Sequence, residues 1–498
     1  MLDRKWWTLI VVCAAIFMLL LDITIVNVAL PPIARDLSAS FTDLQWVIDA
    51  YALTLATFVL NAGSLADLLG RKKVFVGGVV LFTAASALCG AANSSLFLIL
   101  ARAAQGVGGA IMFATSLALI SQEFRGRERG TAFGIWGATT GAAVAIGPLV
   151  GGALTTWLSW RWIFFVNIPI GIATAVIAVL YARESRDPQH GGADWIGLVT
   201  LSASLFTFVY ALLRGNDKGW SSGLIVGMLV GGAVLLALFV VSQLRGSRPM
   251  IDLSLFGRPA FTGAQITAFT LSGAVFAMFL YLTLYLQNYL GFSPIQTGVR
   301  FLPITVLAFV CAAASGKLTA QMPVRLLLAV GLLLCAVGLF LLRNITVDSS
   351  WTALLPGFLL MGAGVGLTNP ALASTAIGVV PPARAGMASG TNSTFRQVGI
   401  ATGIAAFGAL FEHHVRAAFP GIHGAQLNAL ASGRLNELAG QANQQVVRHV
   451  DHVFVGGLRE LFLIGACVAF AGAVCALALV RQEDFTAEAG HEAELVAG

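Results

Sequence analysis

Fourteen mostly apolar stretches of roughly 19 to 27 residues follow one another along this chain, and each is long enough to cross a hydrocarbon layer of about 30 Å as an α-helix. Of the 498 residues, 57% are hydrophobic and 10% are charged, whereas soluble proteins carry about a quarter charged residues. A backbone in lipid must satisfy its hydrogen bonds internally, and the alternating pattern of barrel strands is absent. The sequence therefore predicts an all-α integral membrane protein.

We expect the spans near residues 7–31, 44–65, 74–92, 96–120, 130–155, 161–182, 194–214, 221–242, 261–286, 297–320, 324–343, 351–377, 389–412 and 455–481. Lys and Arg concentrate in the links on the same side as the N-terminus, for example at Arg71, Lys72 and Lys73. Cytoplasmic loops carry this excess of positive charge, so both termini are predicted to lie in the cytoplasm of a multi-pass cell-membrane protein. The net charge of +6 indicates contact with anionic lipid headgroups and no nucleic-acid partner.

Glycine positions recur in the two halves of the chain at a shift of about 256 residues, which indicates a duplicated unit. Gly130 and Gly147, for example, correspond to Gly386 and Gly403. We expect two six-helix bundles related by a parallel repeat, with two helices inserted between them. The predicted units are a first bundle at 1–186 that couples protons, inserted helices at 187–245, helices 9–13 of the second bundle at 246–412, an extracytoplasmic loop at 413–457, helix 14 at 458–481 and a cytoplasmic tail at 482–498.

Three charged residues lie within predicted spans of the first half, and the second half has no counterparts to them. A charge at the bilayer centre costs about 2.5–3.5 kcal/mol, so such residues should face a cavity and pair with one another. The helical rise places Asp22 roughly 14 Å, Asp49 roughly 8 Å and Arg102 roughly 9 Å below the outer face. We therefore expect one Asp–Arg–Asp cluster.

Such a cluster can hold an acid that gains and loses a proton near neutral pH, because a guanidinium favours a charged carboxyl group and burial favours a neutral one. This is the physical requirement for coupling transport to a proton gradient. The alternative is that Asp22 or Asp49 only caps or bonds a neighbouring backbone. On a helical wheel Asp22 points away from Thr24 and Asn27, so the first span does not present one polar stripe.

The link between the second and third spans, at residues 63–73, combines small, acidic and basic residues. Gly63 and Gly70 allow close helix approach and a tight turn, Asp67 can face a helix N-terminus or an Arg, and Arg71 and Lys72 can anchor at the inner leaflet. We interpret this link as a latch between the bundles. A plain solvated turn is the alternative.

The fifth span carries the segment GAAVAIGPLVGG at residues 141–152. Small residues at Gly141, Gly147, Gly151 and Gly152 let two backbones pack closely, and Pro148 removes one helical hydrogen bond. This pattern predicts a kinked, closely packed helix at the bundle interface.

Six segments in this order resemble the signature motifs of one family, the fourteen-span drug:proton antiporters of the major facilitator superfamily. They are LDITIVNVALP (21–31), GSLADLLGRKK (63–73), LILARAAQGVGGA (98–110), GAAVAIGPLVGG (141–152), WRWIFFVNIPIG (160–171) and ARAGMASGTNSTFRQVG (383–399). The resemblance covers nearly the whole chain. It implies a major facilitator fold with two six-helix bundles plus two inserted central helices.

The resemblance also implies roles for single residues. Asp22 would be the membrane-embedded acid and Arg102 the arginine tied to proton transfer, and Gly147 with Pro148 would form the antiporter hinge. Asp67 and Arg71 would form the latch. The family usually has a basic residue directly after that Asp, where this chain has Leu68.

The predicted function is proton-driven export of hydrophobic or cationic drugs and toxic compounds from the cytoplasm or inner leaflet. Aromatic and methionine side chains within the spans suit such cargo. The expected partners are small-molecule drugs, protons and membrane lipids, with a periplasmic adaptor only if the host has an outer membrane. We expect no cofactor and no metal. The candidate cavity residues are Asn27, Trp136, Phe276, Tyr281, Asn392 and Arg396.

Two other functions stay open. The same motifs would serve an exporter of an endogenous secondary metabolite or lipid. A polytopic membrane enzyme would need acids or metal ligands such as His413, His414, His449, Asp451 and His452, whose spacing does not match a metal site. ATP-driven transport is disfavoured because the chain has no GxxxxGK[ST] loop.

Overall fold

The computed structural model describes residues 3–124, 126–185, 194–246, 249–318, 322–380, 385–419, 430 and 444–481. Within these residues the secondary structure is helical throughout. The first half contains α1 (Arg4–Asp36), α2 (Phe41–Leu69), α3 (Arg71–Gly90), α4 (Ser95–Glu123), α5 (Gly126–Trp157), α6 (Trp162–Phe165), α7 (Asn167–Tyr181), α8 (Trp195–Lys218) and α9 (Gly223–Arg245).

The second half begins with a short 3-10 helix and contains two π-helical segments within one long span. Its elements are η1 (Leu253–Gly257), α10 (Pro259–Leu271), η2 (Ser272–Phe276), α11 (Met278–Leu284), η3 (Tyr285–Tyr289), α12 (Pro294–Leu318), α13 (Val324–Leu342), η4 (Trp351–Leu354), α14 (Leu355–Gly378), α15 (Ala385–Ala418) and α18 (Gln444–Leu479). The predicted tail at 482–498, and much of the predicted loop at 413–457, lie outside the described residues.

The described part has 13 helices that are long and apolar enough to cross a membrane, and a bent pair within α5 raises the number to 14. That pair, Ile135–Val144 and Ile146–Trp157, meets at 45°. Pro148 explains the bend, because it cannot donate a hydrogen bond to the carbonyl of Val144. The prediction of an all-α membrane protein with fourteen spans is confirmed.

Local polar residues fix several helix starts. Ser40 and Asp43 form a reciprocal capping box at the start of α2, with N–H to oxygen distances of 2.9 and 3.1 Å. Asp194 accepts a hydrogen bond of 2.8 Å from the backbone N–H of Gly197 at the start of α8. Between α2 and α3, Gly70 has a φ of 113°, a conformation that glycine tolerates.

The first helix is longer than the sequence predicted. We expected it to end near Pro31, but α1 continues through Pro31 and Pro32 to Asp36. Pro32 has no N–H to offer the carbonyl of Val28. Gln287 of η3 donates to that carbonyl instead, at 2.6 Å. A contact from the other half of the chain therefore compensates for the proline.

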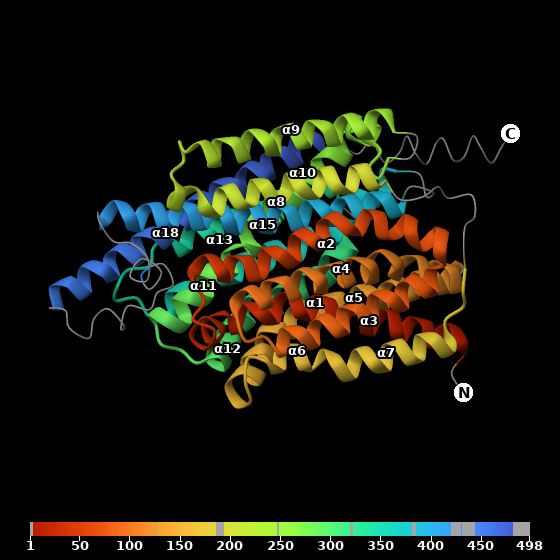
Figure 1. The fold of residues 1–498 in the computed structure, drawn as a ribbon, viewed down its shortest axis with the longest axis horizontal. Coiled ribbons are helices and arrows are strands. Elements are labelled where there is room, and N and C mark those ends of the chain that lie inside the picture. Colours follow the sequence, from red (N-terminus) through yellow and green to blue (C-terminus); the bar gives the residue numbers. More distant parts are fainter. Residues whose placement is uncertain are drawn as a thin grey trace.

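In Figure 1 the helices α1 to α7 lie together along the lower side, and α8 and α9 run along the upper edge. The helices α8 and α9 pack against each other, and α8 also packs on α2 and α15. The helix α1 begins, and α18 ends, at the same end of the molecule. We call this the terminal end, and the end at which α1 finishes the distal end.

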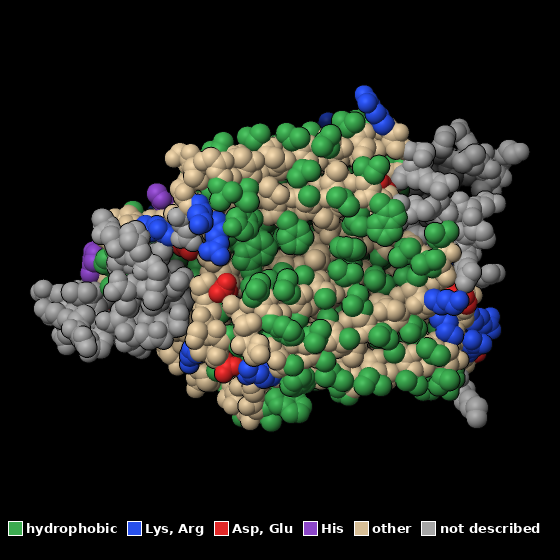
Figure 2. Space-filling model, in the orientation of Figure 1, with side chains coloured by type: hydrophobic (Ala, Val, Ile, Leu, Met, Phe, Trp, Pro, Cys, Tyr) green, Lys and Arg blue, Asp and Glu red, His purple; other side chains and the backbone are tan. Residues whose placement is uncertain are grey.

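The outer surface has the distribution of side chains that a bilayer requires. Figure 2 shows hydrophobic side chains spread over the long sides, with Lys, Arg, Asp and Glu gathered at the two ends. Large apolar residues such as Leu100 and Val199 expose 60% and 62% of their area. Lipid tails rather than water suit such a surface.

The helix α5 packs against both halves of the molecule. A Cβ at Gly151 would lie 2.7 Å from Cγ1 of Ile25 in α1. A Cβ at Gly152 would lie 2.8 Å from Cα of Ile295 in α12. Glycine is required at both positions, because real Cβ atoms do not approach other atoms so closely.

Candidate functional site

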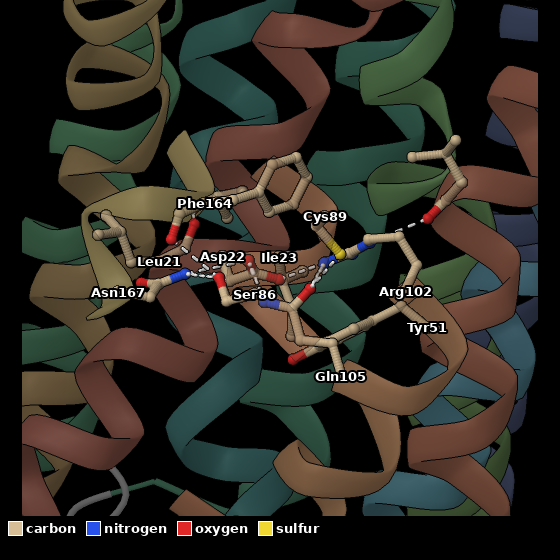
Figure 3. A network of polar contacts seen from close by, with 12 residues as sticks. Leu21, Asp22, Ile23, Tyr51, Ser86, Cys89, Arg102, Gln105, Phe164 and Asn167 are labelled. Atoms are coloured by element: carbon tan, nitrogen blue, oxygen red, sulfur yellow. Dashed lines mark hydrogen bonds and ion pairs between the residues drawn. The ribbon is translucent and has the colours of Figure 1, made fainter. Parts of the chain in front are cut away.

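A buried carboxylate on α1 is the centre of a polar network in the first half of the chain (Figure 3). Asp22 is 1% exposed. Its Oδ2 accepts a hydrogen bond from Nη1 of Arg102 at 2.5 Å. Its Oδ1 accepts from Nε2 of Gln105 at 2.9 Å and from Nδ2 of Asn167 at 3.4 Å. Both carboxylate oxygens are therefore satisfied.

Arg102 lies on α4 and is also 1% exposed. Its Nη1 donates to Oε1 of Gln105 at 2.7 Å, and its Nε donates to the carbonyl of Val47 in α2 at 3.1 Å. The guanidinium carbon lies 4.1 Å from the ring centroid of Tyr51, in a cation–π contact. The ion pair thus connects α1, α2 and α4.

Two further helices join the network through neutral side chains. Asn167, at the start of α7, donates to Oγ of Ser86 in α3 at 3.0 Å, and that hydroxyl donates to the carbonyl of Phe164 at 2.9 Å. The thiol of Cys89 in α3 donates to Oε1 of Gln105 at 3.6 Å. A buried ion pair is tolerated in an apolar bundle when its remaining polar atoms are satisfied in this way.

The prediction that Asp49 joins Asp22 and Arg102 in one cluster is wrong. Asp49 is fully buried, but among the described residues neither of its carboxylate oxygens has a hydrogen-bond partner. Val47 and Tyr51, which contact Arg102, lie one turn apart on one face of α2, and Asp49 points roughly 200° away from them. One turn earlier on that other face, Gln45 donates to the carbonyl of Ile404 in α15 at 2.9 Å. Asp49 therefore faces the second half of the molecule.

A cavity of about 40 Å³ lies between the two halves. Its wall combines residues of α1, α2 and α5 with residues of η2, α11, α12 and α15, namely Ile23, Thr24, Asn27, Val28, Ile48, Val144, Pro148, Phe276, Phe279, Phe301, Thr305, Ile400 and Ile404. Asn27 and Phe276 among the predicted cavity residues lie on this wall. Asp22 is not among the lining residues, so the expectation that it faces a cavity is not met here; it points away from Thr24 and Asn27 on the helical wheel.

The other predicted cavity residues lie elsewhere. Tyr281 is 1% exposed because its ring packs against Phe41, Phe407 and Phe411, and its hydroxyl donates to the carbonyl of Ile404 at 2.8 Å.

Trp136 packs its ring against Phe113 with centroids 6.2 Å apart. Asn392 donates to Oε1 of Gln265 at 3.3 Å. Arg396 donates to Oδ1 of Asn369. None of these three residues is among those that line the cavity.

The link predicted to be a latch contacts the end of the first bundle. The carboxylate of Glu184 accepts from the backbone N–H groups of Lys72 and Lys73 at 3.1 and 3.3 Å. The backbone N–H of Arg71 donates to the carbonyl of Ser185 at 3.0 Å. The side chain of Asp67 lies outside the described residues. The latch role of Gly63, Asp67, Gly70, Arg71 and Lys72 therefore stays a prediction.

The hinge segment occupies the predicted place between the halves. Gly147 packs on Thr24 of α1, and Pro148 packs on Gly298 of α12. Gly141 lies in α5, outside the residues whose surroundings are described.

The histidines considered for an enzyme do not form a metal site in the described part of the chain, where no three His, Cys, Asp or Glu residues gather suitably. His414 pairs instead with Glu460, with 2.9 Å between Nδ1 and Oε2.

Sequence reasoning missed the neutral members of the network, Gln105, Asn167 and Ser86, and it missed Glu184. Two signals were available. Gln105 lies one turn after Arg102 on the same face of α4. Asn167 is the only amide in the segment WRWIFFVNIPIG at 160–171.

Two bundles of membrane helices, joined at a central cavity and with a buried ion pair in one bundle, define a polytopic transporter. A model of the family described as Major Facilitator Superfamily matches residues 12–404. The chain belongs to this superfamily.

Relatives within the family support this assignment. The chain is 36% identical over 486 residues to the multidrug resistance protein Stp of Mycobacterium tuberculosis (strain CDC 1551 / Oshkosh), covering 95% of this chain and 90% of the relative. It is 37% identical over 407 residues to the puromycin resistance protein pur8 of Streptomyces alboniger, covering 81% of each. A solved bacterial homologue of the human lysosomal transporter Spinster, in an inward-facing and occupied conformation, has the same fold, with a TM-score of 0.66, 16% identity, and coverage of 97% of this chain and 99% of that one.

Proposed function

We propose that this transporter exports small lipophilic molecules, including drugs, in exchange for protons. The observation that carries the proposal is the buried pair of Asp22 and Arg102. A proton on Asp22 would remove the charge that holds Arg102 and would weaken the contacts of α1 with α4 and α7. Proton binding and helix movement would then be linked, as an exchange mechanism requires. Asp49, which is buried without a partner among the described residues, is the second proposed proton site.

The cargo would bind between the bundles. The cavity of about 40 Å³ is far smaller than the roughly 300–1,000 Å³ of drug-sized sites. Binding therefore requires the bundles to separate. The close packing of α5 on both α1 and α12 makes α5 the proposed hinge.

Both termini would lie in the cytoplasm, and residues 63–73 would latch the bundles on that side. Residues 1–186 would couple protons, and the helices at 187–245 would be an insertion. The partners would be drug-like molecules, protons and lipids, with an adaptor only where an outer membrane exists. Transport would proceed without an enzymatic step.

The names of the relatives favour drug export, because one is a multidrug resistance protein and the other a puromycin resistance protein. The second name specifies a single compound. A narrow exporter of one endogenous metabolite is therefore the second candidate function.

The test is dye transport in inside-out membrane vesicles, with and without an imposed pH gradient. We expect ethidium uptake to require the gradient and to fall at least about tenfold in Asp22→Asn. Asp36→Asn is the matched control, because Asp36 lies on the same helix, is exposed and pairs with Arg161. It should transport like the unmodified protein. Full gradient-driven uptake by Asp22→Asn would overturn the proposed role.

A further inference from the structure

Arg396 is a second membrane-embedded arginine, and its surroundings differ from those of Arg102. It is partly buried on α15, and its guanidinium donates to Oδ1 of Asn369 in α14. Within the part of the chain that the structure describes, no carboxylate pairs with it. Arg102 in contrast is paired with Asp22. The second bundle therefore holds a cation without a counter-charge in the described residues.

The depth of Arg396 makes this arrangement costly. It lies eleven residues after the start of α15 at Ala385, which corresponds to about 17 Å along the helix axis. Since the predicted span begins near residue 389, Arg396 lies about 10 Å inside the hydrocarbon layer. An arginine at this depth faces a cavity or a bound partner rather than lipid.

The helical spacing places Arg396 beside the central cavity. Ile400 and Ile404 line that cavity, and Arg396 precedes them by one and two turns on the same face of α15. Thr394, on another face, donates to the carbonyl of Ala56 in α2. Arg396 therefore lies next to the lining residues, on the same face of α15 and toward the terminal end.

Amide groups surround the same turn of α15. Asn392, one turn before Arg396, donates to Gln265 of α10. Gln265 is fully buried, and its Nε2 has no hydrogen-bond partner among the described residues. An oxygen anion can accept hydrogen bonds both from an unpaired buried amide and from a guanidinium without a counter-charge.

We propose that Arg396, assisted by the amides of Asn392 and Gln265, binds the carboxylate of acidic aromatic cargo. The guanidinium offers a planar pair of donors that matches a carboxylate. The aromatic body of the cargo would then extend toward Phe276, Phe279 and Phe301 on the cavity wall. This inference rests on the proposed export function, and it extends the expected cargo, because the sequence had predicted hydrophobic or cationic compounds.

The experiment measures equilibrium binding to the full-length protein in nanodiscs of phosphatidylcholine, without any gradient. The ligands are pyrenebutyrate, its methyl ester and a pyrene of equal chain length that carries a trimethylammonium group. Binding is followed by energy transfer from the tryptophans, with empty discs subtracted. We expect pyrenebutyrate to bind about tenfold more tightly than its ester, as a charged hydrogen-bonded pair allows.

Variants then assign this preference to one side chain. Arg396→Gln should lose about tenfold in affinity for pyrenebutyrate and stay within about twofold for the other two ligands. Asn369→Asp should act like Arg396→Gln, because it supplies the missing counter-charge. Arg300→Gln is the matched control. It removes an arginine of α12 that stacks on Phe292 and should keep the preference.

Two results would overturn the inference. One is equal binding of acid and ester by the unmodified protein. The other is an equal loss for all three ligands in Arg396→Gln together with an unchanged preference in Asn369→Asp, which would indicate a structural role. Since no gradient is present, a failure of proton coupling in the vesicle test leaves this measurement valid.

Discussion

At the scale of single residues, the Asp22–Arg102 pair is held by more than mutual attraction. The carboxylate also accepts from Gln105 and Asn167, and the guanidinium also donates to the carbonyl of Val47. These contacts offset the loss of hydration that burial imposes on both charges. Removing one charge alone would leave the other buried without compensation.

The pairing of these two charges predicts the stability of three variants. Arg102→Met should lower the free energy of unfolding by about 3–5 kcal/mol, because it leaves the buried carboxyl group of Asp22 without its counter-charge. The double variant with Asp22→Asn should recover much of that loss. Thermal unfolding of both single variants and the double variant in detergent measures the coupling energy. Strictly additive effects would contradict the pairing.

Part of this site could be predicted from the sequence, because charges in a membrane require partners and helical rise gives their depth. The predicted pair of Asp22 and Arg102 is present in the structure. Asp49 does not join them, because depth does not fix the face of a helix, and α2 turns Asp49 away from Arg102. Gln105 and Asn167 were not predicted, since a neutral amide in an apolar span is not costly enough to demand an explanation.

At the scale of elements, α5 is a helix that packs against both bundles. Its small residues face α1 on one side and the start of α12 on the other. The fifth-span motif predicted this packing. Its glycines allow two backbones to approach closely, and its proline removes one helical hydrogen bond and bends the helix. The π-helical segments at Ser272–Phe276 and Tyr285–Tyr289 were not predicted, since apolar runs carry no period that separates π from α turns.

The α5–α12 contact gives a second prediction. A Cβ at Gly298 would lie 2.9 Å from the carbonyl carbon of Pro148 and 3.1 Å from Cα of Leu149. These are backbone atoms that cannot move aside alone. Gly298→Ala should therefore destabilise the protein by about 1–3 kcal/mol, with a matching loss of transport.

The control for this prediction is Gly227→Ala in α9. A Cβ there would meet nothing within 4 Å, so alanine should keep transport and should stabilise the helix by up to about 1 kcal/mol. Thermal unfolding and vesicle uptake of both variants make the comparison. Equal behaviour of the two would show that the α5–α12 contact is not tight.

At the scale of the whole molecule, polar contacts tie the bundles together near the distal end. Gln45 donates to the carbonyl of Ile404, and Arg35 donates to Oδ1 of Asn288 at 3.4 Å. Gln287 donates to the carbonyl of Val28 close by. In the proposed orientation this end faces outward, so these contacts would have to separate before cargo is released.

A cross-linking experiment tests that requirement. Cysteines replace Arg35 and Asn288 in a background without the six native cysteines, and a bifunctional methanethiosulfonate reagent with a reducible spacer joins them. We expect transport to fall at least about tenfold and to return on reduction, because alternating access needs the two bundles to rock apart. Cysteines at Asp36 and Arg161, which pair at 2.6 Å within the first bundle, form the control, and their cross-link should leave transport intact. Undiminished transport with the Arg35–Asn288 pair fully cross-linked would mean that the distal end does not open during export.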